Sequence, residues 1–113
     1  MRKVTRDAVG AFLAGGSDSF GNTHSDGRSL FLHGNRIAEI RDDGSVWATL
    51  AGWGTPTTRE RLNGVCSLLE HFGVFPSFFG QSDFAQFWGG AEIGTHEWVQ
   101  LAPAGTIKLG GAA

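Results

Sequence analysis

The chain has 113 residues, a hydrophobic fraction of 41% and a formal net charge of −2, which fits one globular domain over residues 1–113. The slight negative charge argues against a strong electrostatic grip on nucleic acid, because that grip needs an excess of Lys and Arg. A single cysteine, Cys66, excludes an internal disulfide. Together with the lack of a signal-like N-terminus or a long apolar run, it predicts a reducing cytoplasm and no membrane segment.

The first predicted element is a short helix over Val4–Ala14, because its apolar residues recur on one helical face. Thr5 or Asp7 is the expected cap at its start. Two glycines should end the helix, and the segment Gly15 to Ser19 is expected to be a flexible connection.

Four short strands should follow, separated by turn dipeptides. Asp26-Gly27, Gly34-Asn35 and Asp43-Gly44 are typical two-residue hairpin turns, since their residues accept a positive φ. A bulged loop over Asp42-Asp43-Gly44 is the alternative, and it would shift the last strand. The sequence therefore predicts an antiparallel meander with strands at Phe20–Ser25, Arg28–His33, Arg36–Arg41 and Ser45–Ala51.

The meander should have one apolar and one mixed face, because side chains alternate along a strand. The two-residue turns place Leu32 opposite Ile37, and Arg41 opposite Val46. The apolar face is expected to carry Thr23, Leu30, Leu32, Ile37, Val46, Ala48 and Leu50. The mixed face is expected to carry Phe20, Asn22, His24, Phe31, His33, Arg36, Ile40, Trp47 and Thr49.

The main helix is predicted over Thr57–Phe72, where apolar residues recur at helical spacing. Its N-terminus has two alternative caps: Thr55 before a proline at the first helical position, or Thr57 in a capping box with Glu60. Gly73 should end it. The expected fold is α+β: an antiparallel meander with this one main helix packed on one face, and a short N-terminal helix.

The last third of the chain is rich in aromatic residues and glycine. We expect strands at Phe84–Trp88 and His96–Ala102, with Gly89-Gly90 near a turn. The stretch Ser77 to Asp83 is expected to be irregular.

Two stretches carry a family resemblance. The first is LFLHGNRIA from Leu30 to Ala38, and the second is AGWGTPTTRERLN from Ala51 to Asn63. Their motifs, LHGN-x-IA and GW-x-T-x-TT-x-x-RLN, resemble those of small proteins encoded in tailed-bacteriophage genomes, over roughly Gly21 to Gly64. The resemblance implies an accessory protein that acts in the host cytoplasm by binding and inhibiting a host protein. Inhibitors of CRISPR and other host defences are of this size and kind.

The residues themselves offer little catalytic chemistry. Cys66 falls on or beside the apolar side of the main helix, where a thiol is normally inert packing. The motifs of serine hydrolases, zinc proteases and nucleotide-binding loops do not occur in the sequence. The four histidines lack the spacing of metal ligands: His24, His33, His71 and His96. We therefore expect no metal, no cofactor and no enzymatic activity.

Aromatic side chains form the leading candidate surface, because exposed aromatics are typical of protein-binding hot spots. No Lys or Arg occurs between Gly73 and Ile107, which favours a protein partner over nucleic acid. A homo-oligomer joined through this segment is a further alternative. The predicted protein-binding residues are Phe78, Phe79, Phe84 and Trp88, with Trp47 from the mixed sheet face.

The start of the main helix is the alternative candidate, since free N–H groups, hydroxyls and arginines suit a phosphate. The competing structural interpretation is helix capping, with Arg59 or Arg61 paired to acids. The predicted nucleic-acid-binding residues are Thr57, Thr58, Arg59, Arg61 and Arg36.

Overall fold

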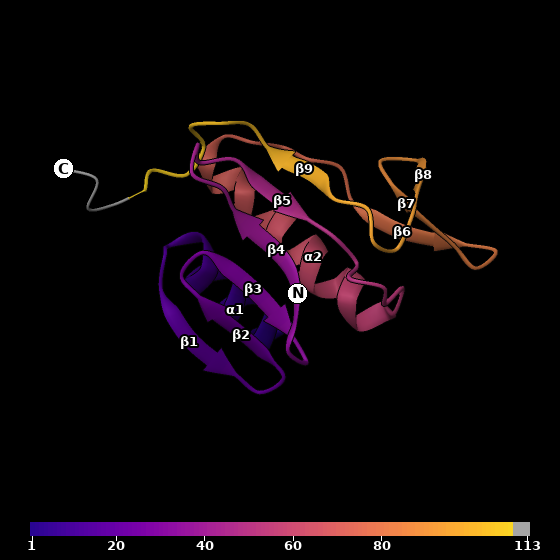
Figure 1. Ribbon diagram of the computed structural model, residues 1–113, viewed down its shortest axis with the longest axis horizontal. Coiled ribbons are helices and arrows are strands. Elements are labelled where there is room, and N and C mark those ends of the chain that lie inside the picture. The colour runs from indigo at the N-terminus through magenta and orange to yellow at the C-terminus, as the bar shows by residue number, and fades with distance from the viewer. Residues whose placement is uncertain (110–113) are drawn as a thin grey trace.

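The computed structural model describes residues 1–109. They form two α-helices, one 3-10 helix and nine strands (Figure 1). In chain order these are α1 (Lys3–Leu13), β1 (Ser17–Phe20), β2 (Thr23–Asp26), β3 (Ser29–Leu32), β4 (Asn35–Ile40), β5 (Val46–Ala48), α2 (Pro56–Leu68), the 3-10 helix η1 (Leu69–Phe72), β6 (Phe79–Ser82), β7 (Ala85–Trp88), β8 (Ala91–Ile93) and β9 (Val99–Ala102).

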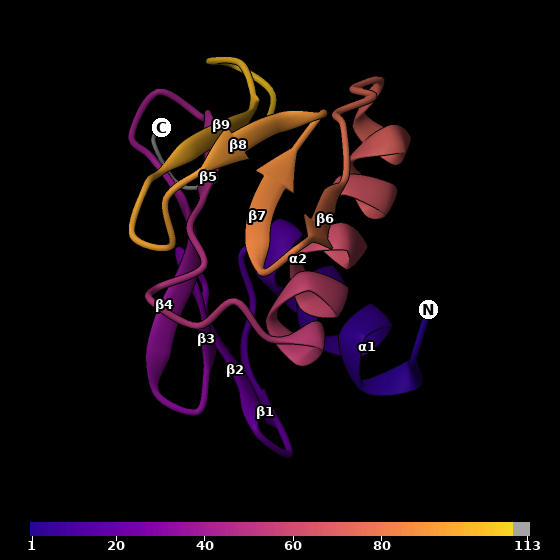
Figure 2. The ribbon, with the colours of Figure 1, turned by 90° about the vertical axis from the view of Figure 1, so that its right-hand side faces the viewer.

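The strands form two antiparallel sheets. The larger sheet has the order β1-β2-β3-β4-β5-β9, and the smaller has the order β6-β7-β8. Both helices lie on the same side of the larger sheet, with α1 against β1, β2 and β3 and α2 against β4 (Figure 2). The predicted α+β class is therefore confirmed. The prediction of a single meander was incomplete, because β6, β7 and β8 form a sheet of their own.

Three strands were not predicted. β1 lies in the segment Gly15 to Ser19 that we expected to be flexible, and β6 lies in the stretch Ser77 to Asp83 that we expected to be irregular. β8 follows the Gly89-Gly90 turn directly. β1 is a polar edge strand with the sequence SDSF, so it shows no alternation of apolar and polar residues.

The first two predicted hairpin turns were each misplaced by one residue. The central residues of the β3–β4 turn are His33 and Gly34, whose φ angles are 51° and 81°. Positive φ at both central residues is what a type I′ turn needs. Leu32 consequently pairs with Asn35, where Ile37 was predicted. In the β2–β3 hairpin, Thr23 pairs with Leu32. At these turns the pairing moves by two residues, which leaves each side chain on its predicted face.

Two irregularities, one on each side of β4, compensate each other. Phe31 pairs with Arg36 but Leu30 pairs with Ala38, so Ile37 is the extra residue of a bulge. The β4–β5 connection is the alternative three-residue loop Asp42-Asp43-Gly44, and Ile40 pairs with Val46. Each irregularity reverses once the face of the sheet on which the following side chains lie, so the two reversals cancel.

As a result, the seven residues predicted for the apolar face are all buried. The predicted places of Ile40 and Thr49 on the mixed face were wrong, since both are buried too. The other residues of the mixed face are exposed or half-buried.

The helices bury residues against this face of the sheet. Ala8, Val9 and Phe12 of α1 are fully buried, as are Leu62 and Val65 of α2. The Thr55 cap is confirmed, because its hydroxyl accepts the Thr58 N–H and Pro56 is the first helical residue. Gly73 ends η1 with a φ of 77°, as expected. Phe72, the last residue of η1 and of the predicted helix, is 43% exposed and does not join the buried face.

Arg61 lies in the interior with 2% of its side chain exposed. Its guanidinium donates to the hydroxyl of Thr23 on β2 and the hydroxyl of Thr5 on α1, both at 2.9 Å. It also forms an ion pair with Glu60. The carboxylate of Glu60 in turn accepts the Thr5 hydroxyl and the Arg2 N–H. Thr5 therefore links the two helices. The prediction that Thr5 or Asp7 caps α1 was wrong, because α1 has no side-chain cap and Asp7 pairs with Lys3.

We expect opposite effects from alanine at the two helical glycines. A Cβ at Gly64 would lie 2.3 Å from the Thr5 methyl group, so Gly64→Ala should destabilise by about 1–3 kcal/mol. A Cβ at Gly10 meets no atom within 4 Å, so Gly10→Ala should stabilise by about 0.5–1 kcal/mol. Urea unfolding measures both values, and equal effects would contradict this helix contact.

Removal of the buried guanidinium should be strongly destabilising. Arg61→Ala removes the donor shared by two buried hydroxyls and the counter-charge of the Glu60 carboxylate, so we expect a loss of about 3–5 kcal/mol. The control is Arg36→Ala, because Arg36 is exposed and a change there should stay within about 0.5 kcal/mol. Similar losses in the two variants would show that the Arg61 network contributes little.

The Glu60 carboxylate should make stability depend on pH. Burial raises the pKa of Glu60, but hydrogen bonds from Thr5, the Arg2 N–H and Arg61 outweigh it, so this pKa lies below the ordinary 4.5. The carboxylate therefore adds stability above pH 4.5, and this contribution is lost as the pH falls through the folded-state pKa. At pH 7 the free energy of unfolding of the wild type should exceed that of Glu60→Gln. The difference between the two should vanish as the pH falls through the folded-state pKa of Glu60. A gap that is constant with pH would refute this link.

Candidate functional site

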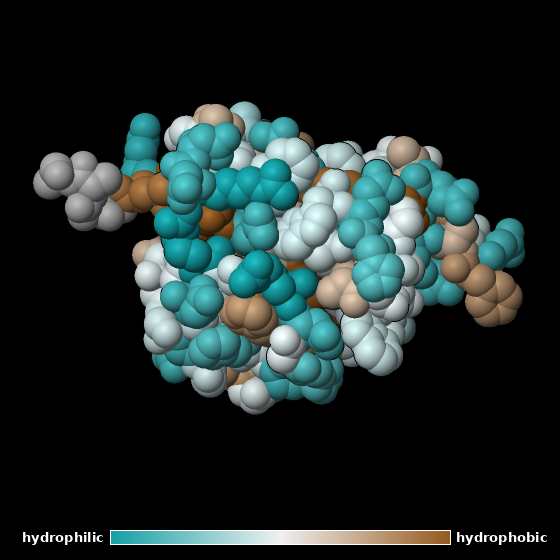
Figure 3. All heavy atoms as spheres, viewed as in Figure 1, coloured by the Kyte–Doolittle hydropathy of each residue, from teal (hydrophilic) through white to brown (hydrophobic). Residues whose placement is uncertain are grey.

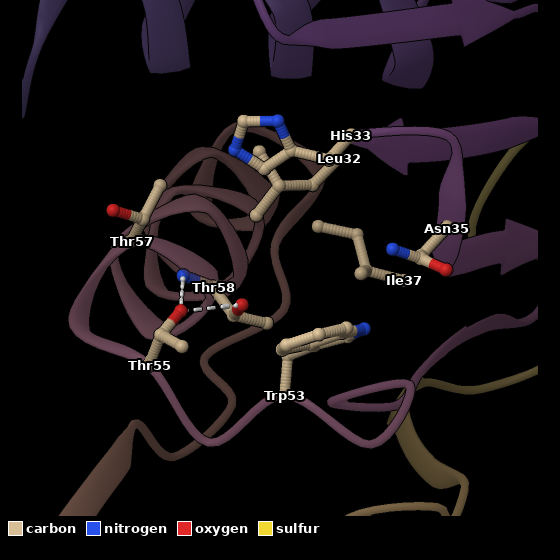
Figure 4. Close-up of a pocket in the computed structure, with 8 residues that line it drawn as sticks. All are labelled: Leu32, His33, Asn35, Ile37, Trp53, Thr55, Thr57 and Thr58. Atoms are coloured by element: carbon tan, nitrogen blue, oxygen red, sulfur yellow. Dashed lines mark hydrogen bonds between the residues drawn. The ribbon is translucent and has the colours of Figure 1, made fainter.

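A pocket of about 320 Å³ opens where the β3–β4 turn meets the start of α2 (Figure 4). Both stretches that carry the family resemblance contribute to it, one from each side. The lining residues are Leu32, His33, Asn35, Ile37, Trp53, Thr55, Thr57 and Thr58. We call this hollow the motif pocket.

The loop after β5 places Trp53 at the pocket. Ala51 and Gly52 have φ angles of 55° and 87°, and the Trp53 N–H donates to the Leu50 carbonyl, which closes a tight turn. Gly52 suits this turn, because its φ lies in the left-handed region and a Cβ would lie 2.7 Å from the His96 ring. The turn leaves the Trp53 side chain 56% exposed beside the pocket.

The first turn of α2 offers less to an anion than the sequence suggested. Pro56 has no N–H, and the Thr58 N–H donates to the Thr55 hydroxyl at 3.2 Å. The hydroxyls of Thr55 and Thr58 are hydrogen-bonded to each other at 2.9 Å, and Thr58 is 1% exposed. Thr57 is half-buried and also lines the pocket.

The three arginines predicted to bind nucleic acid do not converge. Arg61 is buried in the network described above. Arg59 donates to the carbonyl of Gly54 and to the side chain of Gln86, both at 3.0 Å. Arg36 is exposed and lies over the Phe31 ring, 5.7 Å from its centroid. Arg59 and Arg61 therefore have a structural role, as the competing interpretation of the helix start predicted. Of the two, only Arg61 pairs with an acid.

The five aromatic residues predicted to bind a protein are also separated. Phe79 is buried, with 5% exposed, and packs against Trp88 at a centroid distance of 6.2 Å. Trp88 is half-buried, and its indole N–H is buried with no hydrogen-bond partner among the described residues. Trp47 lies on the larger sheet, where the Arg41 guanidinium covers its ring at 3.9 Å. These three residues have structural contacts that the sequence did not reveal.

Phe78 and Phe84 are exposed. Phe78 is 54% exposed beside Met1 and the outer side of α2. Phe84 is 93% exposed in the turn between β6 and β7. In the view shared by Figures 1 and 3, hydrophobic surface appears at the end of the molecule where this hairpin projects.

The smaller sheet is held to α2 at its base. The Asn63 side chain donates to the Phe79 carbonyl at 3.1 Å and accepts the Phe79 N–H at 2.7 Å. Asn63 thereby pairs with β6 as a neighbouring strand would. The β6–β7 hairpin is thus fixed to the main helix, and its turn points away from it (Figure 1).

The sequence interpretation missed Trp53, His33 and Asn35 as members of one pocket. Asn35 was assigned only to a turn and His33 only to the mixed sheet face, and Trp53 was named only within the second motif. The available signal was the pair of motifs, because each contains half of the lining residues.

Other chemistry is limited in the part of the chain that the structure describes. Burial raises the pKa of the Cys66 thiol to about 12, so it is a poor nucleophile. Residues 1–109 contain no group of three His, Cys, Asp or Glu side chains arranged to hold a metal ion. Neither helix in this range has the length and hydropathy of a membrane-spanning segment.

Comparison with known proteins extends the resemblance beyond the two motifs. No curated protein and no solved structure matches the sequence. The family model described as Kyanoviridae Gp96 protein matches residues 1–108, so the ends of the chain contribute as well as the centre. The chain therefore belongs to the Kyanoviridae Gp96 protein family, a family of tailed-phage proteins.

Proposed function

We propose that this chain is a non-enzymatic phage accessory protein that binds a protein in the cytoplasm of the bacterial host and inhibits it. The contact is the turn of the β6–β7 hairpin, led by Phe84. The observation that carries the proposal is the unusual setting of Phe84: a bulky apolar side chain that is almost fully exposed and has a positive φ.

The backbone at this turn favours glycine. Ser82 pairs with Ala85, so Asp83 and Phe84 are the two central residues, with φ angles of 49° and 68°. This is a type I′ turn, in which Gly is the preferred second residue, and a bulky residue with positive φ costs about 1–3 kcal/mol. The chain uses Gly34 at the equivalent place in the β3–β4 turn.

Phe84 does not offset this cost within the protein, because 93% of its side chain is exposed. An aromatic side chain that buries its surface in a partner would offset it, and such residues dominate binding energies in protein interfaces. The clamp between Asn63 and Phe79 holds the hairpin in place before binding, which lowers the entropy that association must overcome.

The charge of this region indicates the kind of partner. Between Gly73 and Ile107 the chain has no Lys or Arg, while it has Asp83, Glu92 and Glu97. Asp83 lies next to Phe84 in the turn. A partner that suits this surface has an apolar pocket with basic residues at its rim. An acidic surface of this kind is a poor match for nucleic acid or for anionic lipid.

The inhibitory role and the target class rest on the phage family alone. Proteins of host defence, including CRISPR systems, are the targets we would examine first. The nucleic-acid alternative has less support, since Arg61 is buried and Arg59 is held by Gly54 and Gln86.

The variant Phe84→Gly should separate binding from stability. Glycine accepts the turn conformation, so we expect unchanged stability or a gain of about 1 kcal/mol in urea unfolding. Tagged wild-type protein and Phe84→Gly are used in parallel to capture proteins from host lysate, and the purified candidate is then titrated calorimetrically. The wild type should bind it at least ~30-fold more tightly, as expected for the loss of a hot-spot aromatic.

Phe79→Ala is the matched control for the stability measurement. Its ring is buried, so its loss should cost about 3–5 kcal/mol of stability, whereas Phe84→Gly should cost none. Light scattering of the free protein tests the homo-oligomer alternative. If no host protein distinguishes the wild type from Phe84→Gly, or if Phe84→Gly alone abolishes a dimer, the proposal of a host partner at this turn is wrong.

A further inference from the structure

We infer that the motif pocket is a binding site for a small, uncharged, planar heteroaromatic molecule of the nucleobase or nucleoside class. This inference is independent of the proposed function, because the pocket and the β6–β7 turn share no residue. Three properties of the pocket carry it: its charge, its walls and its unused polar groups.

The pocket has no charged side chain of the Asp, Glu, Lys or Arg type among its eight lining residues. A ligand with a full charge would lose water there without meeting a counter-charge, which is unfavourable. At the helix start Pro56 has no N–H and that of Thr58 is bound to Thr55, which leaves only the Thr57 N–H to face an anion. These facts favour an uncharged ligand.

The walls favour a flat ligand. Leu32 and Ile37 are 4% and 1% exposed, so they form a fixed apolar floor. Figure 4 shows the Trp53 indole nearly edge-on, with a face turned toward Ile37. An exposed indole opposite branched aliphatic side chains suits a ring that stacks on one side and packs on the other. The volume of about 320 Å³ is at the lower end for small-molecule sites.

Polar groups at the pocket give the ligand a hydrogen-bonding edge. Among the eight lining residues, the only hydrogen bonds that involve a side chain join Thr55 and Thr58 (Figure 4). The Asn35 amide and one nitrogen of His33 thus remain available at the pocket, whereas the Thr57 hydroxyl points away from the other lining residues (Figure 4). An amide presents a donor and an acceptor in one plane, which is the pattern that pairs with the edge of a nucleobase.

The test is an NMR titration of the intact protein with adenosine, guanosine, cytidine and uridine. At least one nucleoside should shift the Trp53 indole N–H and Asn35 amide signals to saturation. Trp53→Ala should weaken that binding ~5- to ~150-fold, the range known for loss of base stacking, while Trp53→Phe should retain most of it. Asn35→Ala should weaken it too. Because Trp53 is 56% exposed, its replacement should leave the fold intact.

The matched control is Phe84→Gly, which should bind the nucleoside as the wild type does, because it changes only the hairpin. Failure of the host-protein proposal would therefore leave this result unaffected. The inference is overturned if none of the four nucleosides gives saturable shifts, or if Trp53→Ala binds as tightly as wild type.

Two related probes test the stated ligand class. The 5′-monophosphate of the best nucleoside should bind no more tightly than the nucleoside, because the pocket lacks cations. Tighter binding of the monophosphate would overturn the uncharged class. A single-stranded oligonucleotide of the same base should show no more than tenfold tighter binding per base, and a larger gain that disappears with salt would assign the site to nucleic acid instead.

Discussion

The buried guanidinium of Arg61 is the interaction on which the arrangement of helices and sheet depends. A buried cation is unfavourable unless its hydrogen bonds and its charge are matched. Here the matching groups come from three elements: Thr5 on α1, Thr23 on β2 and Glu60 on α2 itself. Any rotation of one element against the others would leave a buried polar group without a partner. The network thus selects one arrangement from the many that apolar packing alone would allow.

The two exposed candidate surfaces, the motif pocket and the β6–β7 turn, lie at different places on this arrangement of helices and sheet. Four non-glycine residues in the described range have a positive φ, and all lie at these surfaces or directly beside them: His33, Ala51, Asp83 and Phe84. The first pair belongs to the turns that shape the motif pocket, and the second forms the β6–β7 turn. In both places the backbone departs from its preferred region next to an exposed aromatic ring, and the rest of the fold supplies the stability that this requires.

Hydrophobic periodicity was sufficient to predict α1, α2 and the central strands, because those elements bury apolar side chains on one face. It was insufficient where strands are short or polar, as in β1. The seven residues predicted for the apolar face are buried although the pairing was wrong, because the bulge at Ile37 and the three-residue loop after Arg41 cancel each other. The role of Arg61 was not predictable, since Thr5 and Thr23 lie far from it in sequence and meet it only in the folded chain. For the same reason the sequence showed the two motifs but not that they line one pocket, since they meet only in the folded chain.

The last strand of the larger sheet comes from a distant part of the chain. β9 pairs with β5, about half the chain earlier, and everything between them has been synthesised before that pairing can form. On the ribosome, the backbone groups of β5 stay unpaired on one side until β9 has emerged. Such an open edge can recruit strands from other molecules, so a product truncated before β9 is prone to aggregate. Completion of the sheet is therefore a late step in the folding of this protein, slowed by the long loop that it must close.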